Sequence, residues 1–176
     1  MKITYAAAIS EDGFIAAEDG SVAWLDDLKI DPDETGLEAF FASVGGLIMG
    51  RHTYDFIFDY GSWPYEDKPT WVCTSRSLES LEGANLTVVS HIADAIAAAA
   101  AQGLQHLWLV GGGQLASSVL QHDWLTHLSL SEMPVRLGAG IPLFSAHRLN
   151  EIETLNRQEV QKKGFRQIEI TIRETD

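Results

Sequence analysis

The chain has 176 residues, of which 45% are hydrophobic and 21% are charged, so it has enough apolar material for one continuous core. Its 12 basic and 25 acidic residues give a formal net charge of −13, which argues against binding to nucleic acid or to an anionic membrane. The start lacks a secretory signal pattern, and no uninterrupted apolar segment approaches about eighteen residues. We therefore expect a single cytoplasmic domain over residues 1–176, with no membrane partner.

Cysteine and histidine usage narrows the possible chemistry. Cys73 is the only cysteine, so neither an intrachain disulfide nor a Cys-rich metal site can form. The six histidines lack the paired or i,i+4 spacing of a zinc site, and there is no Gly-x-Ser-x-Gly elbow. We expect no metal, and we set aside both metal hydrolases and serine hydrolases.

Strands and helices are predicted to alternate through most of the chain. Strands are expected at residues 3–9, 46–49, 70–73, 86–89, 106–110 and 125–131. Helical patterns lie between them at residues 34–44, 53–58, 92–101 and 114–120. This alternation is typical of an α/β fold with a largely parallel sheet.

The last part of the chain follows a different pattern. Residues 151–162 and 165–173 are joined by Lys163-Gly164, and Ile168, Ile170 and Ile172 alternate with polar residues. The sequence therefore predicts an antiparallel hairpin at the C-terminal end of the sheet.

The tetrapeptide Gly50-Arg51-His52-Thr53 lies between a predicted strand and a predicted helix. At a helix start, about four backbone N–H groups lack intrahelical partners and attract an anion. Glycine lets the backbone approach that anion, while Arg51 adds charged donors and Thr53 adds a hydroxyl or a helix cap. This turn has the features of a phosphate site.

A second glycine turn, Gly111-Gly112-Gly113, follows the strand predicted at residues 106–110. Either turn alone is equally well explained as a tight turn, but two in one domain indicate a nucleotide that carries several phosphates. The spacing Gly111-x-Gly113-x-x-Ala116 also fits the loose dinucleotide fingerprint of the doubly wound fold, with Glu132 as the ribose acceptor. That alternative leaves too few strands after the fingerprint.

The segment Thr74-Ser75-Arg76 follows the strand predicted at residues 70–73 and offers two hydroxyls and a guanidinium. This combination suits a monophosphate on a ribose, whereas a bare ribose diol is usually held by an acidic group. The segment therefore favours NADPH over NADH. The alternative is that Arg76 is a solvated loop charge.

Three motifs, in this order, resemble the dihydrofolate reductase superfamily. They are Ala6-Ala7-Ala8-Ile9-Ser10-Glu11-Asp12-Gly13-Phe14-Ile15-Ala16, Met49-Gly50-Arg51-His52-Thr53-Tyr54 and Val110-Gly111-Gly112-Gly113. Residues 10–16 and 132–144 are more closely similar to the C-terminal reductase domain of the bifunctional riboflavin-biosynthesis deaminase-reductase and to its stand-alone relatives. The resemblance implies a three-layer α/β/α fold, with a mostly parallel mixed sheet and an antiparallel C-terminal hairpin, and an NADPH-dependent reductase.

Carried over position by position, the resemblance also implies an NADPH site. The first glycine turn would lie on the pyrophosphate, the loop at residues 74–76 around the 2′-phosphate, and the second glycine turn near the pyrophosphate and the nicotinamide, with residues 11–24 as a lid. The expected cofactor-binding residues are Ala8, Ile15, Ala16, Gly50, Arg51, His52, Thr53, Thr74, Ser75, Arg76, Val110, Gly111, Gly112, Gly113, Gln114 and Leu115.

A proton donor is expected on the first helix. In folate reductases an acidic residue there helps to supply the proton, and Asp33 and Glu34 occupy the corresponding stretch. If the helix extends that far, one of these carboxylates faces the same apolar cavity as the stripe at residues 37–44, where desolvation would raise its pKa. The alternative is that Asp31-Pro32-Asp33-Glu34 is only a well-capped helix start.

The expected substrate is a small pyrimidine, pterin or related heterocycle. Trp24 and Phe41 are expected to contact it, with Trp63 and Tyr65 as further stacking candidates and core packing as the alternative. Phe14 stands where the riboflavin reductases often have Lys or Arg, so a riboflavin precursor does not follow directly. Dihydrofolate reductase activity and a non-catalytic NADP(H)-binding module are the alternatives, and the resemblance implies a homodimer.

Overall fold

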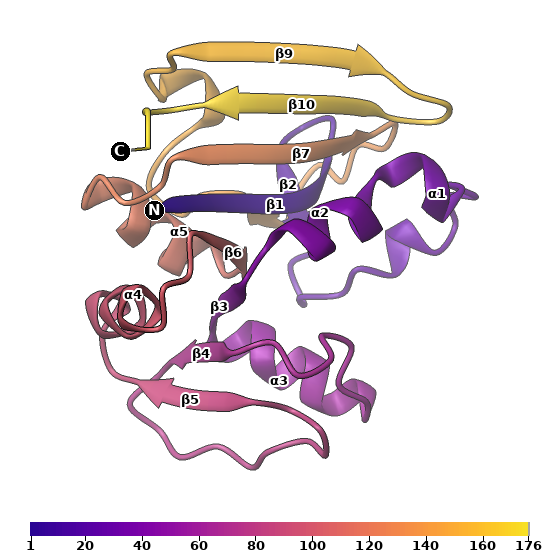
Figure 1. Ribbon diagram of the computed structural model, residues 1–176. Coiled ribbons are helices and arrows are strands. Elements are labelled where there is room, and N and C mark those ends of the chain that lie inside the picture. Colours follow the sequence, from indigo (N-terminus) through magenta and orange to yellow (C-terminus); the bar gives the residue numbers. More distant parts are fainter. Residues whose placement is uncertain (176) are drawn as a thin grey trace.

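The computed structural model describes residues 1–175 and is built around one sheet of eight strands, in the order β5-β4-β3-β6-β1-β7-β10-β9 (Figure 1). These strands are β1 (Lys2–Ser10), β3 (Gly46–Gly50), β4 (Thr70–Cys73), β5 (Leu86–Val89), β6 (His106–Gly111), β7 (His127–Met133), β9 (Asn156–Gln161) and β10 (Arg166–Thr171). Two further strands, β2 (Phe14–Ala16) and β8 (Ile141–Pro142), pair with each other in a small separate sheet.

The main sheet is mostly parallel. β1 pairs with β6 and β7, β3 pairs with β4 and β6, and β4 pairs with β5, all in parallel register. β10 runs antiparallel to both β7 and β9. The mixed sheet with an antiparallel C-terminal hairpin, predicted from the sequence, is therefore confirmed.

Helices cover both faces of the sheet because side chains alternate along the central strands. On β6, Leu107 and Leu109 join the core cluster that includes residues of α4 (Ile92–Ala101) and α5 (Gly113–Gln121). Trp108 points to the opposite face and packs edge-on against Phe40 of α2 (Leu37–Ser43), at 5.4 Å between ring centroids. The helix α3 (Arg51–Tyr60) covers that second face beside α2 (Figure 1). The fold is thus the predicted three-layer α/β/α arrangement.

None of the helices within residues 1–175 has the length and apolar character needed to cross a bilayer. The most apolar of them, α4, is only ten residues long.

The first helical region differs from the single helix expected at residues 34–44. It consists of α1 (Pro32–Thr35) and α2, separated by Gly36, which has φ +69°. Asp31 caps α1, since its Oδ1 accepts a hydrogen bond from the Asp33 N–H at 3.1 Å. Glycine adopts this left-handed conformation at little cost, so it ends one helix and begins another. The break leaves Leu37 exposed rather than in the apolar stripe.

Val72 and Val88 face each other across β4 and β5 but differ in burial, with 0% and 47% of their surface exposed. Val72→Ala removes two methyl groups from the cluster under α3, so we expect it to lower the free energy of unfolding by about 2–3 kcal/mol. Val88→Ala should change it by less than about 0.5 kcal/mol. Urea denaturation followed by tryptophan fluorescence measures both values, and equal effects would contradict the core assignment of Val72.

Candidate functional site

The candidate site lies where the direction of the chain through the sheet reverses. After β3 the chain adds β4 and β5 on one side, and it then returns to place β6 on the other side of β3. Because β3 and β6 are parallel, their carboxyl ends meet at the same edge. In open α/β sheets, ligands bind in the crevice outside the strand ends at such a reversal.

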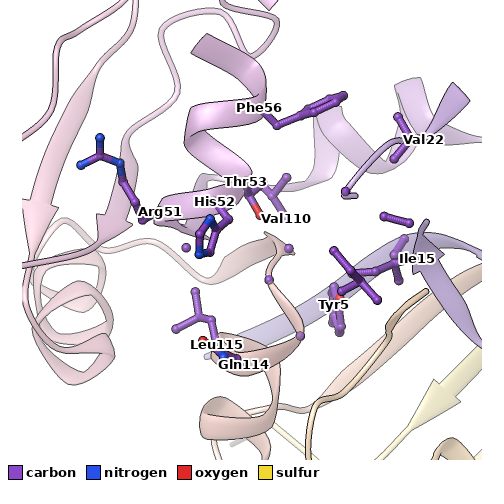
Figure 2. Close-up of a pocket in the computed structure, with 18 of the residues that line it drawn as sticks. Tyr5, Ile15, Val22, Arg51, His52, Thr53, Phe56, Val110, Gln114 and Leu115 are labelled. Atoms are coloured by element: carbon purple, nitrogen blue, oxygen red, sulfur yellow. The ribbon is translucent and has the colours of Figure 1, made fainter. Parts of the chain in front are cut away.

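A cavity of about 1090 Å³ occupies this edge (Figure 2). It brings together most of the residues that the sequence predicts to bind a cofactor. These are Ala8, Ile15, Ala16, Gly50, Arg51, His52, Thr53, Val110, Gly111, Gly112, Gly113, Gln114 and Leu115. Its other walls come from β1, from the segment after β2, from α3 and from the segment around β8.

The two glycine turns lie next to each other and both form part of the cavity wall. A Cβ atom on Gly111 would lie 3.2 Å from Thr53 Oγ1, and one on Gly113 would lie 2.7 Å from the Pro142 carbonyl oxygen. Gly112 precedes α5 with φ +105°, a conformation that favours glycine. Within the described residues, neither α3 nor α5 has a side-chain cap at its start. The first N–H groups of both helices are therefore available to a ligand.

Arg51 marks one end of the cavity (Figure 2). Its Nε donates to Asp55 Oδ1 at 2.6 Å, and its Nη1 donates to the Ser77 carbonyl oxygen at 2.9 Å. The first contact joins adjacent turns of α3, and the second joins α3 to the loop after β4. The guanidinium is thus held in place at the helix start.

The predicted phosphate segment lies in that same loop, outside the cavity lining. Thr74 is half-buried, and its Oγ1 accepts a hydrogen bond from the Arg76 N–H at 3.1 Å. Ser75 and Arg76 are exposed, and Arg76 forms no ion pair within residues 1–175. The Arg51 contact to Ser77 connects the segment to the cavity.

The cavity has no acidic lining, although the chain as a whole is strongly acidic. No Asp or Glu among residues 1–175 lines it. Burial raises the pKa of Cys73 to about 11, with a smaller effect from Asp94, and burial raises the pKa of Tyr65 to about 12. Burial also raises the pKa of Tyr5, whose hydroxyl donates to the Leu143 carbonyl oxygen at 3.3 Å. These three groups are neutral near pH 7, so the site suits an anionic ligand.

The carboxylates expected to supply a proton lie elsewhere. Asp33 and Glu34 are exposed on α1, and Glu34 lines a separate hollow of about 270 Å³ beside β1, β7 and β10. A continuous helix was the condition for placing either carboxylate in the apolar cavity, and Gly36 interrupts that helix. Their proposed catalytic role stays a prediction without support from their position.

The two expected substrate contacts, Trp24 and Phe41, are not among the described residues that line the cavity. Trp24 belongs to a short 3-10 helix (Ala23–Leu25). Leu25 of this helix and Val22 just before it line the cavity. Its Nε1 is buried without a hydrogen-bond partner among the described residues. Phe41 packs against Tyr65 at 6.3 Å between ring centroids, and Tyr65 lines the cavity.

The sequence analysis did not identify all of the lining residues; those it missed include Tyr5, Phe56, Ile57, Cys73, Gly140 and Ile141. Phe56 could have been found, because residues three apart on a helix share a face and Thr53 was already placed there. Gly140 and Ile141 come from the β8 region, which only the folded chain brings to β2. A side chain at Gly140 has no room against the Ala16 carbonyl oxygen.

Asp12 anchors the wall formed by β2 and β8. Its Oδ1 accepts from Ser10 Oγ at 2.7 Å and from the Leu137 N–H at 3.1 Å, and its Oδ2 accepts from the Gly138 N–H at 2.8 Å. Led by the Ser10 contact, these hydrogen bonds lower the pKa of Asp12 to about 2. The anchored segment continues to Gly140 at the cavity.

The fold and the cavity at its strand ends define an α/β domain of the dihydrofolate reductase-like type. Residues 58–169 match the model of the family described as the RibD C-terminal domain, and the chain belongs to this family. It therefore carries a domain of the reductase-like RibD C-terminal type.

Comparison with individual proteins agrees with this membership. A Bacillus subtilis (strain 168) protein described as "Uncharacterized protein YwjB" is 33% identical over 162 residues, which cover 91% of this chain and 88% of that protein. The solved structure of a putative riboflavin biosynthesis protein from Shewanella sp. PV-4 is 27% identical, with a TM-score of 0.78 and coverage of 97% and 98%.

A more distant structure shares the fold. The diaminohydroxyphosphoribosylaminopyrimidine deaminase/5-amino-6-(5-phosphoribosylamino)uracil reductase from Thermotoga maritima is 13% identical, with a TM-score of 0.72. The match covers 97% of this chain and 56% of that protein, so the chain spans about half of its length.

Asp12→Asn tests the anchor of the β2–β8 wall. The pKa of Asp12 is about 2 in the folded protein against an ordinary 3.8, so its ionised form contributes stability that is full above about pH 4 and is lost as pH falls to about 2. The difference in unfolding free energy between wild type and variant should shrink over that range. Urea denaturation at several pH values measures it.

The exposed Asp27, whose carboxylate makes no hydrogen bond within residues 1–175, provides the matched control Asp27→Asn. A wild-type advantage over Asp12→Asn that persists at about pH 2 would contradict the assigned hydrogen bonds.

Proposed function

We propose that the protein is an NADPH-dependent reductase that transfers a hydride to a heterocyclic small molecule. The observation that carries this proposal is the pair of glycine turns on β3 and β6, which present two uncapped helix starts to one cavity. At about 1090 Å³, that cavity is slightly larger than the usual range for small-molecule sites, about 300–1,000 Å³.

The backbone of the two turns, together with Arg51 and Thr53, is positioned to hold a pyrophosphate. Thr74, Ser75 and Arg76 form the proposed site of the 2′-phosphate, and the Arg51 contact to the same loop supports this placement. Because Arg76 has no ion-pair partner within residues 1–175, its guanidinium is available for that phosphate.

The nicotinamide end of the cavity is proposed to lie between β1 and β2. Ala8 and Ala16 are small, and Ile15 offers an apolar side chain, so a flat ring fits against these strands. When bound, the dihydronicotinamide supplies the hydride, and the chain holds the acceptor against it and excludes water. The β2–β8 wall and the segment at residues 20–25 form the proposed cover.

The relatives favour a pyrimidine-type or pterin-type acceptor. The Shewanella structure is described as a putative riboflavin biosynthesis protein. The description of the Thermotoga enzyme includes 5-amino-6-(5-phosphoribosylamino)uracil reductase. These descriptions support a heterocyclic acceptor for this chain without defining its substituents.

Fluorescence titration with NADPH and NADH tests the cofactor. Arg76→Ala removes charge-assisted hydrogen bonds worth about 1.5–3 kcal/mol, so we expect it to weaken NADPH binding about 10- to 100-fold and to leave NADH binding unchanged. Arg136→Ala is the control, because Arg136 is exposed and lies outside the cavity lining.

Equal loss of NADPH and NADH affinity in Arg76→Ala would remove the 2′-phosphate assignment. Wild-type protein that binds neither dinucleotide, or that binds NADPH and reduces no heterocycle, would contradict the proposed function.

We also propose that the protein forms a homodimer through the outer part of its sheet. Every residue of the edge strand β9 is exposed, and Leu155 and Val160 have 61% and 52% of their surface exposed. Large apolar side chains on an open edge strand favour a partner. Sedimentation velocity should give the mass of a dimer, and a monomer at all concentrations would contradict this proposal.

A further inference from the structure

Part of the cavity lining is apolar. Val22 and Leu25 come from the segment after β2, Phe56 and Ile57 come from the later turns of α3, and Tyr65, which packs in the same cluster as Ile57, comes from the loop that follows. In Figure 2, Val22 and Phe56 lie on the side away from the Arg51 guanidinium. We call these five residues the acceptor end.

The acceptor end contains no cation. Among the described residues that line the cavity, Arg51 is the only lysine or arginine, and it is already bonded to Asp55 and Ser77. A phosphate or carboxylate bound at the acceptor end would leave water without gaining an opposite charge, which is strongly unfavourable. The lining therefore disfavours an acceptor that carries an anionic group there.

Tyr65 is the one polar side chain of the acceptor end. Its ring is held by Phe41, Trp63 and Trp108, with ring centroids at 6.3, 5.1 and 5.5 Å. These contacts fix the position of the phenol from several sides.

The Tyr65 hydroxyl is unused by the protein. It makes no hydrogen bond within residues 1–175, and Tyr65 lines the cavity, so the hydroxyl is free to donate to a ligand. The hydroxyl of Tyr5, which also lines the cavity, already donates a hydrogen bond to the Leu143 carbonyl oxygen.

We propose that the acceptor is an uncharged, flat ring compound whose carbonyl or imine group accepts a hydrogen bond from the Tyr65 hydroxyl. This inference rests on the proposed function. The acceptor carbon gains a hydride from the dihydronicotinamide, which is oxidised, and the acceptor oxygen or nitrogen gains the Tyr65 proton. Water then returns a proton to the tyrosinate.

One further observation agrees with this role. Because no carboxylate among residues 1–175 lines the cavity, an accessible phenol fills the place of an acidic proton donor.

The first experiment tests charge. Isothermal titration calorimetry on NADP⁺-saturated protein compares 1,4-naphthoquinone with 1,4-naphthoquinone-2-sulfonate, which differ by one anionic group. We expect the neutral quinone to bind at least about tenfold more tightly. Equal or tighter binding of the sulfonate, or binding of neither quinone, overturns the proposal. Preferential binding of 5-amino-6-(5-phosphoribosylamino)uracil also overturns it.

The second experiment tests Tyr65. Tyr65→Phe keeps the ring and removes the hydroxyl, so NADPH affinity should stay within about twofold of wild type, and the urea midpoint of unfolding should not change. Affinity for the neutral quinone should fall about 3- to 10-fold, and kcat for NADPH oxidation should fall about 10²-fold or more with little change in KM. Tyr60→Phe, at an 80% exposed position outside the cavity, is the control.

The two proposals fail in different ways. If the wild-type protein does not bind NADPH, the proposed function is contradicted. If NADPH binds and Tyr65→Phe retains wild-type quinone affinity and kcat, only the role of Tyr65 is overturned. A large fall of kcat in Glu34→Gln together with normal turnover in Tyr65→Phe assigns the proton to Glu34 instead.

Discussion

The whole site depends on the parallel pairing of β3 with β6. This pairing places two strand ends at one edge, and each strand must then turn into a helix within a few residues. A Cβ atom on Gly111 would lie 3.2 Å from Thr53 Oγ1 of the other turn, and one on Gly113 would lie 2.7 Å from the Pro142 carbonyl oxygen of β8. Space therefore favours glycine at both positions, and glycine brings no side chain to cap the helix that follows.

The distribution of charge matters more to this cavity than the net charge of the chain. A value of −13 would repel a polyphosphate if its acids were spread evenly. Within residues 1–175, however, the acids lie outside the lining, and one of them, Asp55, holds Arg51 in place. A protein that is acidic overall can therefore present a neutral to positive surface to an anion.

Much of the sheet and both glycine turns could be predicted from sequence, because apolar runs that end in glycine are local signals. The break at Gly36 is not visible in the pattern, because the helical spacing of the apolar residues after Gly36 can be continued back to Glu34, and the left-handed conformation of the glycine interrupts the helix there. β2 and β8 are too short, at three and two residues, to show any periodicity. Tyr65 could be predicted as a ring near the substrate, whereas its free hydroxyl depends on contacts made only in the folded chain.

Asp12 joins a turn near the start of the chain to backbone N–H groups 125 and 126 residues later. The cavity beside it draws on residues from Tyr5 to Ser145. A partly folded chain in which one of these two regions is unfolded has no complete cavity. Closing so long a loop costs conformational entropy, which is offset only by the contacts of the complete fold. A ligand that binds only the complete cavity therefore stabilises the native state by an amount that grows with its concentration relative to Kd, and ligand supply becomes a determinant of how much folded protein persists.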